Sequence, residues 1–230
     1  MISAWKCEDR IPDSPPLSIR IGSFLEAYGT AYSFARFWRR GGGALCLIDG
    51  CLTVVSDGGR EVELREFADA VGAESIWSDR LLFPARQRRF SVWHKPGTGK
   101  VDGLPGEVDY RAVYDCLTES FALPDWESWY VDVCHRVRHG TAIACSLEQG
   151  ALCGAVYNGK VLITGISVSK DYRRCGVGTR LLRMAESTGY DLYAITESGE
   201  AEAFYRASGF SLVSNVYGYE KGIDYETGLF

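Results

Sequence analysis

Several features that mark particular classes of protein are missing from this sequence. No apolar run approaches the roughly 18 residues of a membrane-spanning helix, and the first residues, from Met1 to Cys7, lack the apolar stretch of a secretory signal. There are only three histidines, and the eight cysteines include no Cys-x-x-Cys pair. The sequence therefore predicts neither a metal site nor a disulfide framework, and it favours a cytoplasmic protein with reduced thiols.

An excess of positive charge is also missing. The formal net charge is -5 at pH 7, which argues against a nucleic-acid partner or an anionic membrane surface. What the chain does contain is ordinary for a globular protein: 46% of its residues are hydrophobic and 13% are aromatic. At 230 residues it can form one large domain or two small ones, and it does not indicate an oligomeric state.

Residues 1–89 predict a small α/β unit. Its first ten to twenty residues contain Pro12, Pro15 and Pro16 and are expected to be an irregular lead-in. Asp49-Gly50 between two apolar runs predicts a hairpin. The expected elements are a helix at 23–40 stopped by Gly41, strands at 44–48 and 51–55, a helix at 61–71 closed by Gly72, and a strand at 74–77.

Residues 90–230 predict a second, larger unit. A Gly/Pro-rich stretch near its start, at 96–106, is expected to be either a linker or a long mobile loop. Asp125 is a good N-cap, and Asn158-Gly159 predicts a tight hairpin turn. The expected elements are helices at 110–121 and 125–138, strands at 141–147, 151–157 and 161–168, a helix at 176–187, a strand at 191–195, a helix at 200–207, and a final hairpin of 210–213 with 216–221. The two units share an order of elements, and an ancient duplication stays open.

The most informative segment runs from Ile166 to Leu182. A buried strand is expected to end at Val168, and Arg173-x-x-Gly176-x-Gly178 then opens an amphipathic helix. Glycines let the backbone approach a ligand, and the free N–H groups of a helix start bind phosphate. A tight turn with two incidental glycines is the alternative. A P-loop would need Gly-Lys-Ser/Thr, and a dinucleotide fingerprint would need a third glycine where Leu181 stands, so both are excluded.

Together with a downstream segment, this loop resembles the GCN5-related N-acetyltransferase (GNAT) superfamily. Arg-x-x-Gly-x-Gly after a strand is similar to that family's acetyl-CoA pyrophosphate motif. Ala201-Glu-Ala-Phe-Tyr-Arg-Ala-Ser-Gly-Phe210 resembles its second signature. Ser198 stands where the family usually has Asn. The resemblance covers roughly residues 90–230.

The resemblance implies an acyl-CoA N-acyltransferase fold and direct attack of an amine on the acetyl-CoA thioester in a ternary complex. It implies that Ile166 and Val168 hold the pantetheine arm. The implied pyrophosphate site consists of Arg173, Arg174, Cys175, Gly176, Val177, Gly178 and Thr179. Tyr205 matches the tyrosine that protonates the leaving thiolate, although an aromatic packing role beside Phe204 is the alternative.

The general base is not evident. Some family members place a glutamate in the strand before the loop, where this chain has Leu162-Ile163-Thr164. Glu148, Glu197 or a chain of waters could replace it, and both glutamates also fit solvated loop positions. An acyl-enzyme at Cys175 is disfavoured because that thiol lacks a partner base.

The acceptor is expected to be a small-molecule or peptide amine. An acidic and aromatic cluster at the second of the two helices could bind a cation, or could simply be a solvated helix end. It consists of Asp125, Trp126, Glu127, Trp129 and Tyr130. His135 and His139 lie on the same helix and are expected to be surface residues rather than metal ligands.

These patterns predict an α/β protein with a mixed, mostly antiparallel sheet flanked by helices. Residues 90–230 would be the acetyltransferase domain. Residues 1–89 would be a smaller unit that binds no CoA, because the segment 56–63 lacks Gly-x-Gly and carries acids. The alternative function is a non-catalytic acyl-CoA-binding or regulatory module of the same fold.

Overall fold

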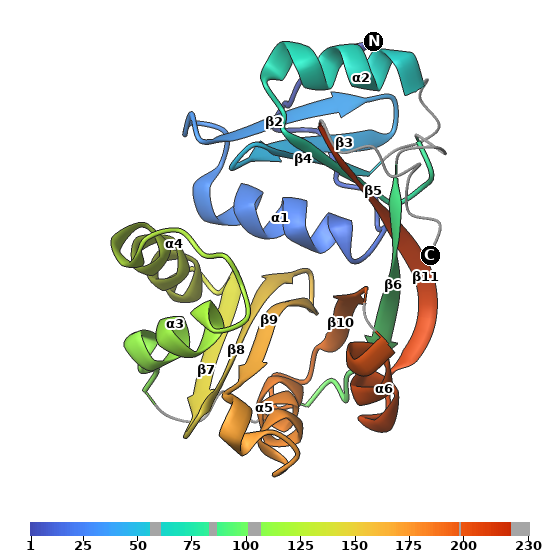
Figure 1. The fold of residues 1–230 in the computed structure, drawn as a ribbon. Coiled ribbons are helices and arrows are strands. Elements are labelled where there is room, and N and C mark those ends of the chain that lie inside the picture. The colour runs from blue at the N-terminus through green and yellow to red at the C-terminus, as the bar shows by residue number, and fades with distance from the viewer. Residues whose placement is uncertain (56–60, 83–86, 101–106, 198, 222–230) are drawn as a thin grey trace.

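One continuous sheet organises the chain in the computed structural model, which describes residues 1–55, 61–82, 87–100, 107–197 and 199–221 (Figure 1). Its eleven strands follow the order β1-β2-β3-β4-β5-β11-β6-β10-β9-β8-β7. Their bounds are β1 Ile2–Ala4, β2 Ala35–Arg40, β3 Gly43–Ile48, β4 Cys51–Val55, β5 Ser75–Ser78, β6 Arg88–Lys95, β7 Ala142–Leu147, β8 Gly150–Tyr157, β9 Lys160–Val168, β10 Asp191–Thr196 and β11 Ser211–Glu220. Only the pairs β4/β5 and β9/β10 are parallel, so the predicted fold class is confirmed.

Helices cover both faces of this sheet. They are α1 Leu17–Tyr28, α2 Glu61–Val71, α3 Tyr110–Thr118, α4 Trp126–Arg138, α5 Val177–Glu186 and α6 Gly199–Ala207, with a short 3-10 helix at Lys170–Tyr172. Leucines of α5 pack with β8 and β10 on one face of the C-terminal half. Helices α3 and α4 pack on the opposite face. Within the described ranges, no helix combines the length and apolarity needed to cross a bilayer.

The strand order reads the same from either end once β1 is set aside. Exchanging β2, β3, β4, β5 and β6 with β7, β8, β9, β10 and β11 reproduces the order of the sheet. The last strand of each half lies in the other half: β6 pairs with β10, and β11 pairs with β5. These two exchanged strands also pair with each other at the centre of the sheet. Neither half therefore has a complete sheet of its own.

Helix α1 joins the two halves (Figure 1). Its Leu17, Ile19 and Ile21 are fully buried in a cluster that includes strand residues from both halves. At its C-terminal end, the Tyr28 hydroxyl donates a hydrogen bond of 2.7 Å to Asp132 on α4. The buried Arg136 guanidinium lies 4.1 Å from the ring centre of Phe24. Apolar burial and one polar network thus fix the two halves together.

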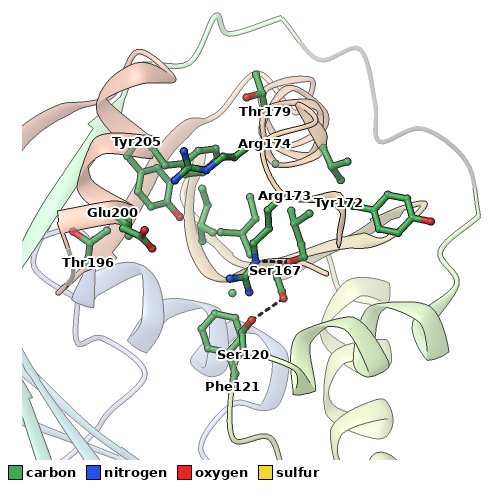
Figure 2. Close-up of a pocket in the computed structure, with 18 of the residues that line it drawn as sticks. Ser120, Phe121, Ser167, Tyr172, Arg173, Arg174, Thr179, Thr196, Glu200 and Tyr205 are labelled. Carbon is green, nitrogen blue, oxygen red and sulfur yellow. Dashed lines mark hydrogen bonds between the residues drawn. The ribbon is translucent and has the colours of Figure 1, made fainter. Parts of the chain in front are cut away.

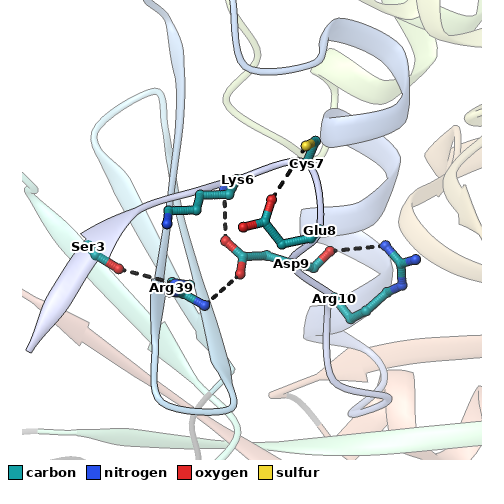
Figure 3. A network of polar contacts seen from close by, with 7 residues as sticks. All are labelled: Ser3, Lys6, Cys7, Glu8, Asp9, Arg10 and Arg39. Atoms are coloured by element: carbon teal, nitrogen blue, oxygen red, sulfur yellow. Dashed lines mark hydrogen bonds and ion pairs between the residues drawn. The ribbon is translucent and has the colours of Figure 1, made fainter.

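The lead-in before α1 is more ordered than expected (Figure 3). Residues Ile2–Ala4 add β1 to the edge of the sheet. Asp9 accepts hydrogen bonds from the Lys6 backbone at 2.7 Å and from the Arg39 guanidinium at 2.8 Å. Arg39 also donates to Ser3. The segment is therefore fastened to β2 by its own side chains.

Local turn and capping signals predicted several elements correctly. Asp49 and Gly50 both have positive φ, as do Asn158 and Gly159, which is the geometry of a two-residue hairpin turn. Asp125 caps α4 by accepting from the backbone of Glu127 and Ser128. The predicted helices at 61–71, 110–121, 125–138, 176–187 and 200–207 and the strands between them are present with small changes of boundary. The segment 56–60 lies outside the described residues. The prediction that its sequence prevents CoA binding by the N-terminal half therefore stays a prediction.

Two predicted elements are wrong, and two strands, β1 and β6, were missed. The helix expected at 23–40 ends at Tyr28, because Gly29 takes φ 62°, and residues 35–40 form β2. The final hairpin is a single strand, β11, with a bulge between Leu212 and Ser214. Strand β6 was not predicted, because its sequence is rich in arginine and its partners lie far away in the chain.

Helix α1 packs so closely on β8 that an added methyl group has no room. A Cβ on Gly22 would lie 2.3 Å from the Tyr157 ring. We expect Gly22→Ala to lower the free energy of unfolding by about 1–3 kcal/mol in a denaturant titration, although alanine favours helix. Gly199→Ala is the matched control, because its Cβ would meet no heavy atom within 4 Å. Equal stability of the Gly22 variant and wild type would show that this contact is loose.

Candidate functional site

Strands β9 and β10 separate partway along their length. Their parallel pairing runs from Lys160↔Asp191 to Ile163↔Ala194, and β9 then continues to Val168 without β10 beside it. The register of β9 with β8 shifts around Thr164, which has no partner there. A cavity of about 950 Å³ opens between the separated strands and continues to α5 and α6 (Figure 2). Such a concave site is of a size that holds a large ligand.

The N-terminal half has no such separation. There, β4 and β5 stay paired up to Val54↔Ser78. Val54 is the last residue but one of β4, and Ser78 is the last residue of β5. The two halves share their strand order but differ at the place where the cavity forms.

One end of the cavity is formed by the start of α5. Gly176 has φ 80°, and Arg174 also has a left-handed backbone with φ 62°. The first bond of the helix is donated by Arg180 to the Gly176 carbonyl at 3.0 Å. The N–H groups of Val177, Gly178 and Thr179 therefore have no partner within the helix. Together with the helix dipole, they form a site suited to an anion.

Small side chains and one arginine shape the middle of the cavity. A Cβ on Gly178 would lie 3.2 Å from the Phe204 ring on α6, so glycine lets α5 and α6 approach each other. The Arg173 side chain lies in the cavity, and its Nε donates to the Val168 carbonyl at 3.1 Å (Figure 2). Ser120 and Ser167 form a hydrogen bond of 2.9 Å that connects the end of α3 to β9.

Tyr205 lies at the other end of the cavity. Its side chain is 5% exposed and packs against Phe204 and Phe210, and the residue lines the cavity. Burial raises the pKa of the Tyr205 hydroxyl well above its ordinary value. The hydroxyl therefore stays protonated at neutral pH and can act as a hydrogen-bond donor toward the cavity.

Nearly all residues predicted for the cofactor site meet around this one cavity. Those that line it are Ile166, Val168, Arg173, Arg174, Gly176, Val177, Gly178, Thr179 and Tyr205. Cys175 does not line it: the thiol is exposed and lies 3.6 Å from the Arg173 carbonyl. The roles predicted for these residues are not tested by their positions.

The two carboxylates considered as substitute bases differ in position. Glu148 is an exposed turn residue with an ion pair to Arg180 at 3.8 Å, and it does not line the cavity. Glu197 does line it, and pairs with Arg88 of β6. Sequence reasoning missed Ser120, Thr196 and Glu200, which also line the cavity. Glu200 directly precedes Ala201 of the second signature. This neighbouring position is the only feature of the sequence that could have indicated Glu200 as a site residue.

The aromatic cluster on α4 lies outside the cavity lining. Asp125 is used as the helix cap, and Arg111 lies 4.9 Å from the ring centre of Trp126. His139 is exposed as predicted, but His135 is half-buried between α4 and α1, where it stacks on Tyr28 at 4.7 Å. In the described part of the chain, no three His, Cys, Asp or Glu side chains gather as metal ligands would.

Comparison with known proteins gives both a sequence match and structural similarities. Residues 132–212 match the acetyltransferase (GNAT) domain family, whereas no curated protein matches the chain. A GCN5-related N-acetyltransferase from Sphaerobacter thermophilus has a TM-score of 0.56 at 16% identity, with 99% of this chain and 98% of that chain covered. A GCN5-related N-acetyltransferase from Kribbella flavida has a TM-score of 0.56 at 11% identity, covering 92% and 98%.

A tandem GNAT protein from the clavulanic acid biosynthesis pathway has a TM-score of 0.51 at 16% identity, with 93% of this chain and 90% of that chain covered. At these identities the likeness to solved structures shows a shared fold. The matched segment 132–212 contains β7 to β10, the start of α5, and Tyr205. This segment is thus similar in sequence to the GNAT acetyltransferase domain family, and the chain shares its fold with solved GCN5-related N-acetyltransferases.

Proposed function

We propose that this protein transfers the acetyl group of acetyl-CoA to a primary amine by direct attack in a ternary complex. The observation that carries the proposal is the cavity between the separated strands β9 and β10, which ends at the free N–H groups of α5. A separated strand offers unpaired main-chain groups to an extended, amide-containing arm, and the helix start offers donors to a diphosphate. Acetyl-CoA has both of these parts, joined in that order.

We assign each part of the cofactor to residues of the cavity. The pyrophosphate would lie on the amides of Val177, Gly178 and Thr179, with Arg174 adding positive charge. The pantetheine arm would follow Ile166 and Val168 on β9. The Val168 carbonyl accepts a hydrogen bond from Arg173 Nε at 3.1 Å, and we expect this side chain to move away when the arm binds. Its guanidinium would then be free to pair with a phosphate oxygen.

The thioester would then lie near Tyr205. In this reaction the sulfur leaves with a negative charge that must be stabilised and then protonated. The Tyr205 hydroxyl is protonated and faces the cavity, and a buried tyrosinate would be costly. We expect the hydroxyl to hydrogen-bond the developing thiolate and to give up its proton only as the sulfur departs.

The alternative, a non-catalytic acyl-CoA-binding module, keeps the same cavity and differs only in turnover. Release of CoA thiol from acetyl-CoA, measured with and without a panel of primary amines, separates the two. Amine-dependent thiol release together with an acetylated product supports the enzyme. Tight CoA binding without turnover on any amine supports the module.

We expect CoA to bind once per chain, because β4 and β5 stay paired in the N-terminal half. Gly178→Val should weaken CoA binding by tenfold or more in isothermal titration calorimetry, because the side chain would fill space between α5 and Phe204. Cys175→Ala is the matched control on the same loop. Its thiol is exposed and away from the cavity, so its affinity should equal that of wild type. Unchanged affinity in the Gly178 variant would exclude this loop.

Tyr205→Phe should lower kcat by roughly tenfold or more with little change in CoA affinity. The variant keeps the ring that packs against Phe204 and Phe210 but removes the proton. Steady-state kinetics and CoA titration on the same preparation check this. Loss of CoA binding with kcat intact would instead make Tyr205 a packing or cofactor-contact residue.

A further inference from the structure

We infer that Glu200 is the general base that takes the proton from the acceptor ammonium. This inference rests on the proposed function and adds the group that sequence reasoning could not supply. The strand position where some family members have a glutamate is occupied by Leu162-Ile163-Thr164. Any carboxylate that serves as base must therefore reach the cavity from another element.

Glu200 reaches the cavity from the first turn of α6, the helix that also carries Tyr205. Figure 2 shows Glu200, Thr196 and Tyr205 grouped at the end of the cavity that lies away from Thr179 and Tyr172. If the diphosphate lies at the start of α5, the extended arm leads away from Thr179 and brings the thioester to this group. The amine that attacks the thioester must arrive at the same place.

The other carboxylates near the cavity are already engaged. Among the described residues that line it, only Glu197 and Glu200 carry a carboxylate. Glu197 is paired with Arg88, so its carboxylate is already engaged by a guanidinium. Glu202 on the same helix turn accepts a hydrogen bond from Ser91 at 2.7 Å. Glu200 forms no hydrogen bond or ion pair with another described residue, so its oxygens are available to a substrate.

The surroundings of Glu200 suit repeated proton transfer. The residue is exposed to solvent, so a proton taken from the substrate can pass to water at the end of each cycle. Tyr205, in contrast, is buried and stays protonated. The same helix thus offers a proton acceptor and a proton donor in different environments.

The proton and electron balance is complete. The ammonium gives one proton to Glu200, and the freed lone pair forms the C–N bond to the thioester carbonyl carbon. The C–S bond breaks, the sulfur keeps the electron pair, and it takes the proton of Tyr205. The nitrogen loses its second proton, which restores Tyr205, and Glu200 releases its proton to water. The products are the amide, CoA thiol and one proton.

The test compares Glu200→Gln with wild type across pH, with spermidine, tryptamine, glucosamine and a serine-initiated peptide as acceptor probes. At about two or more pH units below the pKa of an accepted amine, which includes pH 7 for an alkyl amine, we expect kcat/KM to fall about 100-fold or more, with CoA affinity unchanged. The deficit should shrink to less than about tenfold near the pKa of the amine, because an amine that is already neutral no longer needs the base. Glu200→Asp should be intermediate.

Glu148→Gln is the matched control, since Glu148 is exposed and outside the cavity lining, and it should keep wild-type activity at every pH. A Glu200→Gln variant as active as wild type, or equally impaired at pH 7 and pH 10, overturns the role of Glu200 and leaves the proposed function standing. A wild-type protein that acetylates none of the amines overturns the proposed function, and this inference with it.

Discussion

The cavity depends on how strand β10 is held on the side away from β9. Past the point where β9 leaves, Ile195 and Thr196 of β10 remain paired with Val92 and Ser91 of β6. On the other side, β9 stays paired with β8 as far as Val168. Main-chain groups that lose a partner inside a protein are costly, so two adjacent strands can separate only when each keeps its outer neighbour. Strand β6, which comes from the N-terminal half of the chain, is therefore a structural requirement for the site.

The exchange of β6 and β11 also explains the relation between the two halves. A duplication followed by exchange of the last strands would produce this palindromic strand order. The order therefore supports the hypothesis of an ancient duplication, which the shared order of elements in the sequence had suggested. In the N-terminal half, the corresponding described strands β4 and β5 do not separate but stay paired to the end of β5. The N-terminal half contributes α1 and β6 to the whole fold. The boundary predicted between residues 89 and 90 lies within β6, which runs from Arg88 to Lys95.

Local chemistry made much of the fold predictable. Some signals act within a few residues of the chain. They are the turns at Asp49-Gly50 and Asn158-Gly159, the Asp125 cap, and the glycines at the start of α5. The errors have long-range causes. Apolar residues at 24, 28, 31, 35 and 38 matched a helical period, but Gly29 ends the helix and Trp38 packs on Phe67 in a different layer. Strand β6 has partners about one hundred residues away in the chain.

The candidate site divides in the same way. The residues from Arg173 to Thr179 are consecutive in the chain, and their positions follow from one motif. Ser120, Thr196 and Glu200 come from three separate elements, and only the folded chain brings them to one cavity. The acidic and aromatic cluster at α4 was considered as a cation site. In the structure, Asp125 serves as the helix cap and Arg111 lies over the Trp126 ring.

The position of β11 has a consequence for how the protein emerges during synthesis. Residues 217–220 of β11 pair with Ser75–Ser78, which lie more than 130 residues earlier in the chain. A nascent chain that has completed β1 to β5 still exposes one edge of β5, and an exposed strand edge is prone to pair with other chains. Because domains otherwise tend to fold as they leave the ribosome, the sheet of the N-terminal half must wait for β11. It becomes complete only after residue 220 has been synthesised.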